Sequence, residues 1–244
     1  MCRKLIYLIS FVLVLSLAGA VQATERYWTN GTGTGLWSDA ANWGPSGVPT
    51  SGDKARMGKL PGPIIADIDA AAQYLEMAFG VIGDPLYLSI NTAVTMNSGT
   101  LTVEKGFTVA YDGAGTLNMN GGVITVLGYF SLGRNDWAVG NVNLYGGTIN
   151  SPDCQMWDNP ALVGFSTTMD VTAGTLILNG DKSAEVQGEI DAGWITAYGG
   201  AGTLLLDYNI RNAGRTTLTA IPEPATIALL GLGGLSLLGS RRKH

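Results

Sequence analysis

Apolar and polar residues alternate with a period of two over residues 90–180, and the alternation recurs in blocks. Each block reads apolar-x-apolar-x-x-Gly-x-apolar-x-apolar. One block matches, at eight positions and without a gap, a block that lies 23 residues earlier. It comprises Leu117, Met119, Gly122, Ile124, Val126, Phe130, Leu132 and Gly133; the earlier block comprises Val94, Met96, Gly99, Leu101, Val103, Phe107, Val109 and Ala110. Shorter matches follow 25 and 52 residues later: Val142, Leu144, Gly147 and Ile149, then Met169, Val171, Gly174, Leu176 and Leu178.

A period of two with regularly placed glycines predicts short strands with one buried face rather than helices. Blocks of this length fit either hairpins of an antiparallel sandwich or the rungs of a β-solenoid. Like residues recur in the same column of every block, as expected where each rung stacks on the next. We therefore expect an all-β right-handed parallel β-helix of about four to five rungs. Glycines would form its corners, because glycine adopts positive φ without steric cost. Thr and Asn would form ladders between rungs: Thr95, Asn97, Asn118, Asn120, Asn143 and Thr148.

The flanks of the repeat differ in composition from its centre. Residues 25–60 are rich in tryptophan, with Trp28, Trp37 and Trp43 close together, and predict a cap over the open N-terminal end of the stack. A sugar-binding surface is the alternative for these rings, and residues 64–90 fit irregular first rungs. Four segments follow the repeat: one or two helical turns over 183–190, with Val186 and Ile190 on one face; closing strands near 194–198 and 203–208; and a linker over 211–221.

An insertion interrupts the third block. Residues 151–160 replace an apolar strand with a segment that contains two prolines. Inserted loops on solenoids often carry binding groups, so Trp157, Asp153 and Asp158 are the candidate ligand contacts. The alternative is a surface loop with Trp157 folded back onto the rungs.

The C-terminus carries a three-part pattern. Pro222, Glu223 and Pro224 cannot continue a helix, residues 225–239 are apolar, and Arg241, Arg242 and Lys243 form a basic end. A run of 15 residues is short for a membrane span, which needs about 20. The arrangement resembles the PEP-CTERM sorting signal of Gram-negative bacteria. This resemblance implies that an exosortase recognises Pro222–Pro224, removes the tail and passes the protein to the cell surface or extracellular matrix. It covers about a tenth of the chain.

The N-terminus has the three parts of a secretory signal peptide. Residues 1–4 include two basic side chains, Arg3 and Lys4, and Leu5–Leu17 are apolar. Ala23 ends a small-residue cleavage site for signal peptidase. Cleavage after Ala20 and an uncleaved anchor are the alternatives. The sequence thus predicts a signal peptide with a signal helix over 1–23, a β-solenoid domain over 24–220 with clear repeats over 92–180, and a sorting segment with a hydrophobic helix over 221–244. The Trp-rich start and the Gly-Gly-Thr-Ile rungs resemble secreted β-solenoid proteins with PEP-CTERM tails.

Removal of the two end segments reveals an acidic body. Nine basic and eighteen acidic residues remain over 24–220, a net charge of −9. Such a charge repels the phosphate backbone and excludes nucleic acid as an expected partner. One cysteine, Cys154, remains, so no intramolecular disulfide can form, and we expect a buried thiol.

The body also lacks histidine, because His244 is the only one in the chain. Serine and cysteine triads and histidine-bearing zinc sites are therefore unavailable. A carboxylate pair acting on a glycoside and a Ca²⁺-dependent polysaccharide lyase remain open, but the acids do not align in one column of the repeat. A cluster of Asp112, Arg134 and Asp136 fits a solvated ion pair better than a catalytic one.

Two hypotheses follow for the function. The first is an exported envelope or matrix protein with a structural or adhesive role, no catalysis and no cofactor or metal. The second is a polysaccharide-binding module or a polysaccharide lyase acting on exopolysaccharide. Expected partners are signal peptidase, exosortase, the membrane before processing and, under the second hypothesis, exopolysaccharide.

Overall fold

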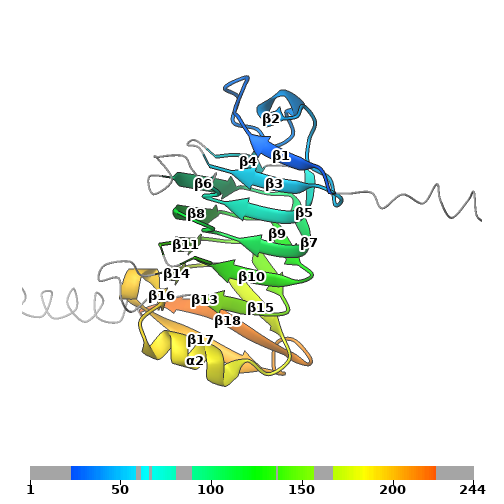
Figure 1. The fold of residues 1–244 in the computed structure, drawn as a ribbon. Helices are drawn as coiled ribbons and strands as arrows, with labels where there is room; N and C mark the ends of the chain where they lie inside the picture. Colours follow the sequence, from blue (N-terminus) through cyan, green and yellow to red (C-terminus); the bar gives the residue numbers. More distant parts are fainter. Residues whose placement is uncertain are drawn as a thin grey trace, which may run out of the picture.

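The computed structural model describes residues 23–58, 62–65, 68–80, 90–135, 137–156 and 167–223, which build a stack of β-strands (Figure 1). Two sheets form it. The smaller sheet has the order β16-β14-β11-β8-β6-β4, and all its strand pairs are parallel. It comprises β4 (Ile64–Ile65), β6 (Asn91–Met96), β8 (Ala114–Met119), β11 (Val139–Leu144), β14 (Thr168–Val171) and β16 (Ile195–Ala197).

The larger sheet runs in the order β17-β18-β15-β12-β9-β7-β5-β3-β1-β2, with β10 and β13 as a branch beside β7. Its strands are β1 (Glu25–Trp28), β2 (Trp43–Gly44), β3 (Lys54–Met57), β5 (Asp69–Met77), β7 (Thr100–Thr108), β9 (Val123–Val126), β10 (Tyr129–Leu132), β12 (Thr148–Ser151), β13 (Cys154–Met156), β15 (Thr175–Asn179), β17 (Gly202–Tyr208) and β18 (Arg215–Pro222). Because β7 pairs with β9 through its first half and with β10 through its second, this sheet folds around two sides of the core.

The predicted β-solenoid is confirmed, and the register of the repeat is the register of the strands. Val94, Leu117, Val142 and Met169 are successive partners across β6, β8, β11 and β14. Leu101, Ile124, Ile149 and Leu176 are successive partners across β7, β9, β12 and β15. All eight side chains are at most 1% exposed. The parallel pairing of these strands excludes the antiparallel sandwich for this part of the chain.

The stack has about six turns rather than four to five, because six strands follow one another in the smaller sheet. The sequence repeat does not include the first and last turns. Their strands in the smaller sheet are short, with two residues in β4 and three in β16, so neither turn contains a full block of alternating residues.

The corners and polar ladders behave largely as predicted. Gly99, Gly122 and Gly147 have φ of 81°, 81° and 76° at equivalent corners. Gly174 is not among the glycines with positive φ. Glycine fits there because an added Cβ would overlap the Leu144 side chain. The side-chain amide of Asn120 donates to Asn97 at 2.9 Å, and that of Asn143 donates to Asn118 at 2.8 Å. These bonds tie successive turns on the outer surface.

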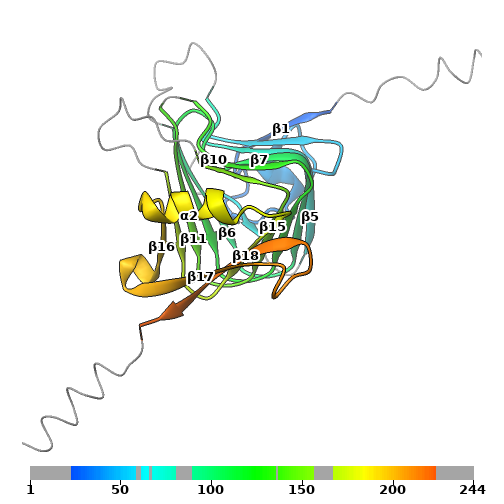
Figure 2. The same ribbon diagram turned by 90° about the horizontal axis from the view of Figure 1, so that it is seen from below.

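Antiparallel strand pairs lie at both ends of the parallel stack (Figures 1 and 2). The antiparallel pair of β1 and β2 lies at the N-terminal end, and the antiparallel hairpin of β17 and β18 at the other. The helix α2 (Ser183–Asp191) lies beside this hairpin and confirms the predicted helical turns, with Val186 buried and Ile190 packed against the core. Two short 3-10 helices, η1 (Ala40–Asn42) and η3 (Tyr198–Gly200), complete the elements.

Three tryptophans of the N-terminal end form one buried cluster. Trp28 and Trp37 each meet Trp43 edge to face, with ring centroids 5.0 Å and 4.8 Å apart. Each side chain is at most 3% exposed. A sugar ring needs an open aromatic face, so these three residues do not offer the sugar-binding surface that was their alternative role.

The predicted linker over 211–221 is wrong. Residues 215–222 form β18, which lies between β15 and β17 and pairs antiparallel with both. Thr216, Thr217 and Leu218 are 1% exposed, since this strand covers the last turn of the core. Among the described helices, none is both long and apolar enough to cross a membrane.

Candidate functional site

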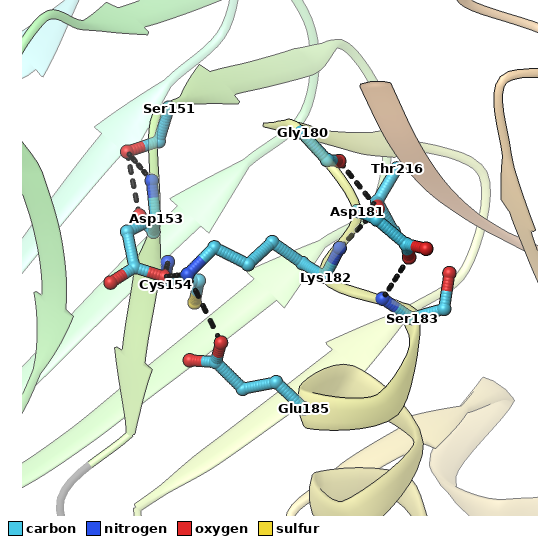
Figure 3. A network of polar contacts seen from close by, with 9 residues as sticks. All are labelled: Ser151, Asp153, Cys154, Gly180, Asp181, Lys182, Ser183, Glu185 and Thr216. Carbon is cyan, nitrogen blue, oxygen red and sulfur yellow. Dashed lines mark hydrogen bonds and ion pairs between the residues drawn. The ribbon is translucent and has the colours of Figure 1, made fainter. Parts of the chain in front are cut away.

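Asp153, the described member of the predicted contact set, lies in the turn between β12 and β13. The predicted inserted loop is wrong for residues 154–156, which form β13 and pair parallel with β10 because Cys154 continues the inward column of Phe130. The Cys154 amide donates to its carboxylate at 3.0 Å, and the Ser151 hydroxyl donates to its carbonyl at 2.7 Å. The Lys182 ammonium lies 3.0 Å from the same carboxylate oxygen (Figure 3). Asp153 is therefore held by its own turn and by a cation from a segment 29 residues further along the chain.

Lys182 joins three parts of the fold. Its Nζ also lies 3.1 Å from Glu185 on α2, and its backbone amide donates to Thr216 of β18 at 2.8 Å (Figure 3). Hydrogen bonds to Asp153 and Glu185 raise its pKa. Beside it, hydrogen bonds from Ser183 lower the pKa of Asp181. The network thus fastens the start of α2 to β13 and to the closing strand.

The other two predicted contacts, Trp157 and Asp158, lie outside the described residues. Whether Asp153 contacts a ligand together with them stays a prediction. In the described part of the chain, Asp153 has a structural role, because its carboxylate accepts a backbone hydrogen bond and pairs with Lys182.

Cys154 lies in an inward column of the stack. Its strand partner is Phe130 on β10, and the column continues with Phe107 on β7 and Leu75 on β5. Burial raises the pKa of the thiol well above its ordinary value, and the nearby charges of Glu189 and Asp153 act in the same direction. The predicted buried thiol is confirmed, and at neutral pH it is protonated and a poor nucleophile.

Glu189 is a functional-group candidate that the sequence pattern did not single out. It lies on α2 between Val186 and Ile190, so it shares their buried face, and its Oε2 has no hydrogen-bond partner among the residues that the structure describes. Burial, followed by the charges of Glu185 and Asp153, raises its pKa to about 7. The available sequence signal was the spacing, because Glu189 lies three residues after Val186 and therefore on the same face of the helix. At neutral pH this group is about half protonated, so it links the packing of α2 to pH.

Glu189 should make the stability of the protein fall as the pH rises. The unfolded carboxyl titrates near 4.5 and the folded one near 7, so the folded state keeps a proton that the unfolded state releases. The stabilising effect of low pH is thus lost between about pH 4.5 and pH 8. The full shift corresponds to about 3 kcal/mol, and residual contact of the carboxyl with solvent lowers our expectation to about 1–2 kcal/mol.

Urea unfolding of the wild-type protein and of Glu189→Gln at pH 5 and pH 8.5 measures this effect. The variant should lose most of the pH dependence, whereas Asp191→Asn, at an exposed position on the same helix, should keep it. Equal pH dependence in wild type and Glu189→Gln would exclude Glu189 as its source.

A second candidate site lies on the same side of the stack. Tyr129, Ser131, Arg134, Asn135 and Gln155 line a groove of about 300 Å³. The Arg134 guanidinium donates to the Tyr129 hydroxyl at 2.5 Å and lies over the rings of Tyr111 and Tyr129, 5.3 Å and 5.5 Å from their centroids. Gly106 lies beneath the Tyr129 ring, which would overlap any Cβ there. The groove therefore combines a cation with hydroxyl and amide groups, and the Tyr129 ring lies between Gly106 and Arg134.

Of the predicted cluster of Asp112, Arg134 and Asp136, Arg134 lines this groove and Asp112 contacts Asn135, another lining residue. Asp112 accepts hydrogen bonds from Asn135 at 2.5 Å and from the Gly80 amide at 2.9 Å. Arg134 lies against tyrosines, as described above, and Asp136 is outside the described residues. The sequence analysis did not name the tyrosines as partners, although Tyr111 lies 23 residues before Arg134, the spacing of the repeat, which was the available signal for this contact. Within the described ranges, no group of three His, Cys, Asp or Glu side chains is placed to hold a metal ion.

The start of the sorting segment lies at the C-terminal end of the stack. Pro222 is the last residue of β18 and is the partner of Gly202, the first residue of β17. Glu223 follows and is exposed. Pro224, Arg241, Arg242 and Lys243 lie outside the described residues. At the other terminus Ala23 directly precedes Thr24, whose carbonyl accepts a hydrogen bond from the Lys54 amide at 2.8 Å. Cleavage after Ala23 stays a prediction.

Comparison with known protein families identifies a PEP-CTERM protein-sorting motif at residues 220–243. This confirms the resemblance drawn from Pro222–Pro224, the apolar run and the basic end. The motif indicates export and sorting to the cell surface in bacteria, and it implies processing by an exosortase. No curated protein and no solved structure was found to match the chain.

Proposed function

We propose that this chain is an envelope or extracellular-matrix protein of a Gram-negative bacterium, with a structural or adhesive role and no catalysis. One observation carries the proposal: the sorting motif begins within the strand that closes a β-solenoid. The exported part is then a stack in which each turn is hydrogen-bonded to the next along its length. Such a body suits a scaffold, because its stability is distributed over many equivalent interfaces.

The proposed export route uses both ends of the chain. Residues 1–23 form the signal peptide, with a signal helix, and signal peptidase cleaves after Ala23. Residues 225–239 then enter the inner membrane as a hydrophobic helix, with Arg241, Arg242 and Lys243 on the cytoplasmic side. Exosortase recognises Pro222, Glu223 and Pro224 and releases the body, so the mature protein corresponds to about residues 24–220.

We further propose two finer features of the body. The first is right-handed winding, because connections between parallel strands of one sheet are right-handed in nearly all folds. The second is that the buried cluster of Trp28, Trp37 and Trp43 serves as the N-terminal cap. These large rings cover apolar surface that would otherwise meet water at the end of the stack.

Three observations support a role without catalysis. The body contains no histidine, and its single thiol lies in the core with a raised pKa. The carboxyl with a pKa of about 7, Glu189, is buried against the core rather than open to a substrate.

The groove around Arg134 favours a second candidate function, the binding of an acidic polysaccharide. Amide and hydroxyl groups hydrogen-bond to sugar hydroxyls, and a guanidinium forms strong, directional hydrogen bonds with carboxylates. Arg134 supplies the guanidinium, and Asn135, Gln155 and Ser131 supply amides and a hydroxyl within one groove. The loop with Trp157, Asp153 and Asp158 is the other proposed contact for such a ligand. A lyase activity on exopolysaccharide belongs to this second candidate.

Affinity electrophoresis in gels that contain acidic or neutral polysaccharides separates the two candidates. If the groove binds, Arg134→Gln should weaken retention by an acidic polysaccharide about tenfold, the effect of one charge-assisted hydrogen bond. Arg211→Gln makes the same change at the far end of the stack and should leave retention unchanged. Loss of retention in Trp157→Ala instead would assign the contact to the loop.

The same samples test the absence of catalysis. Absence of retention by any polysaccharide favours the purely structural role, because that role requires no sugar contact. A rise in the absorbance of unsaturated sugar products during incubation would contradict a role without catalysis.

A further inference from the structure

The C-terminal end of the stack carries an apolar groove of about 800 Å³. Its walls come from α2, β16 and β17, and they include Ile190, Ile195 and the three leucines of β17, Leu204–Leu206. In the described part of the chain, β17 has a strand partner on one side only, because it ends the order of the larger sheet. An apolar edge strand of this kind is a contact surface that soluble proteins usually cover.

Exposed apolar side chains surround the same groove. Ile210 is 81% exposed, the highest value among the exposed large hydrophobic residues, and Ile221 and Tyr208 are 43% and 40% exposed. Ile210 lines the groove, and Tyr208 and Ile221 belong to β17 and β18. We call Leu205, Tyr208, Ile210 and Ile221, together with the groove, the end face.

The C-terminal end of β18 lies a fixed and short distance from the apolar tail. Tyr208 and Ile210 lie toward the opposite end of the β17–β18 hairpin, because Tyr208 pairs with Thr216, so the whole end face reaches the bilayer when the hairpin lies along its surface. Pro222 is hydrogen-bonded into the hairpin opposite Gly202, and only Glu223 and Pro224 separate it from Ala225, where the apolar run begins. Three residue steps span at most about 11 Å. The headgroup region of one bilayer leaflet is about 5–8 Å thick. When the tail occupies the membrane, the end of β18 therefore has to lie at the level of the headgroups or just above them.

We infer that the end face is a membrane-contact surface, which rests on the lipid headgroups while the tail is still attached. The inference rests on the proposed insertion of residues 225–239 and adds the orientation of the body. Ile210 and Leu205 supply apolar groups that enter the interface, and Tyr208 has the amphipathic ring favoured there. Arg211, next to Ile210 and 43% exposed at its side chain, pairs with Asp207 at 3.0 Å, and the other N–H groups of its guanidinium are donors for lipid phosphates. The stack then stands away from the bilayer with its tryptophan end outward.

Fluorescence of residues 24–244, the chain that signal peptidase leaves, in phosphatidylcholine vesicles tests this orientation, because the tail is then its terminal apolar segment. An environment-sensitive dye is attached at Ile210→Cys or, at the opposite end, at Leu36→Cys. Both positions are exposed, so neither change disturbs packing, and the buried Cys154 thiol with its raised pKa does not compete for the dye. Lipids with a nitroxide near the headgroup should quench the dye at position 210 at least threefold more than the dye at position 36.

Equal quenching at both positions, in protein that floats with the vesicles, would overturn the inference. A blue-shifted dye at position 210 without lipid quenching would also overturn it, because a second protein copy would then cover the end face. Failure of the chain to float with the vesicles would instead reject the insertion of the tail. The two failures are therefore distinguishable.

Discussion

Replacement of Gly115 by alanine is expected to prevent stable folding of the solenoid. Gly115 lies in β8, between Thr92 of β6 and Gly140 of β11. A Cβ at this position would overlap the carbonyl oxygen of Val109 and crowd Ala110. The obstacle is backbone rather than the end of a flexible side chain, so no rotamer change relieves it.

The backbone around Val109 has little freedom to move away. The Val109 amide donates to Ser131 at 2.8 Å, the Tyr111 amide donates to Met77 at 2.9 Å, and the Val109 side chain is fully buried. Relief of the overlap would break bonds in two neighbouring turns. We expect a loss of at least about 4 kcal/mol, a large part of the 5–15 kcal/mol that typically stabilises a folded domain.

Far-UV circular dichroism and urea unfolding of Gly115→Ala measure the effect. Gly188→Ala is the matched control, because Gly188 lies within α2 and an added Cβ meets nothing within 4 Å. It should raise stability by about 1 kcal/mol through helix propensity. A Gly115→Ala protein that unfolds within about 1 kcal/mol of wild type would contradict the close backbone packing described here.

The combined change Glu223→Ala and Pro224→Ala is expected to abolish delivery of the protein to the cell surface. The motif implies exosortase processing, and Glu223 and Pro224 are the part of the proposed recognition sequence, Pro222–Pro224, that follows the last strand. Glu223 is exposed and follows β18, so its replacement leaves the strand pairs of the body unchanged. We expect the unprocessed chain to accumulate in the inner membrane at least tenfold over wild type, because its tail is not removed.

Cell fractionation, with mass measurement of the chain in each fraction, gives the readout. Asp191→Ala removes an exposed acid from the same end of the stack and should be processed normally. Normal surface delivery of the doubly substituted chain would refute recognition through Glu223 and Pro224. Circular dichroism of both variants separates a processing defect from a folding defect.

The sequence predicted the central turns in register because a parallel stack repeats its environment. Leu117 meets Val94 on one side and Val142 on the other, so all three positions need a similar apolar side chain. The same reasoning placed Asn97 beside Asn120. Where successive turns have nearly the same length, residues one repeat apart in the sequence are therefore predicted to contact each other.

The ends of the stack could not be predicted in this way, because an end strand has one neighbour instead of two. β18 runs antiparallel and follows no repeat, so its sequence was taken for a linker. The two short end turns were likewise missed in the rung count. The Asp153–Lys182 contact joins an insertion to a helix start 29 residues away, and no periodic signal connects them.

The sequence alone determined the class of fold, the register of the central turns, the acidic body and the sorting motif. Each depends on composition, local order or repetition, which are properties of the linear chain. The tertiary structure decided which groups from distant parts of the chain meet: Lys182 with Asp153, Glu189 with the core, and the groove at the C-terminal end with the start of the sorting motif. These groups come from different turns or from the ends of the stack. Their proximity depends on how the chain closes the stack, which no local pattern encodes.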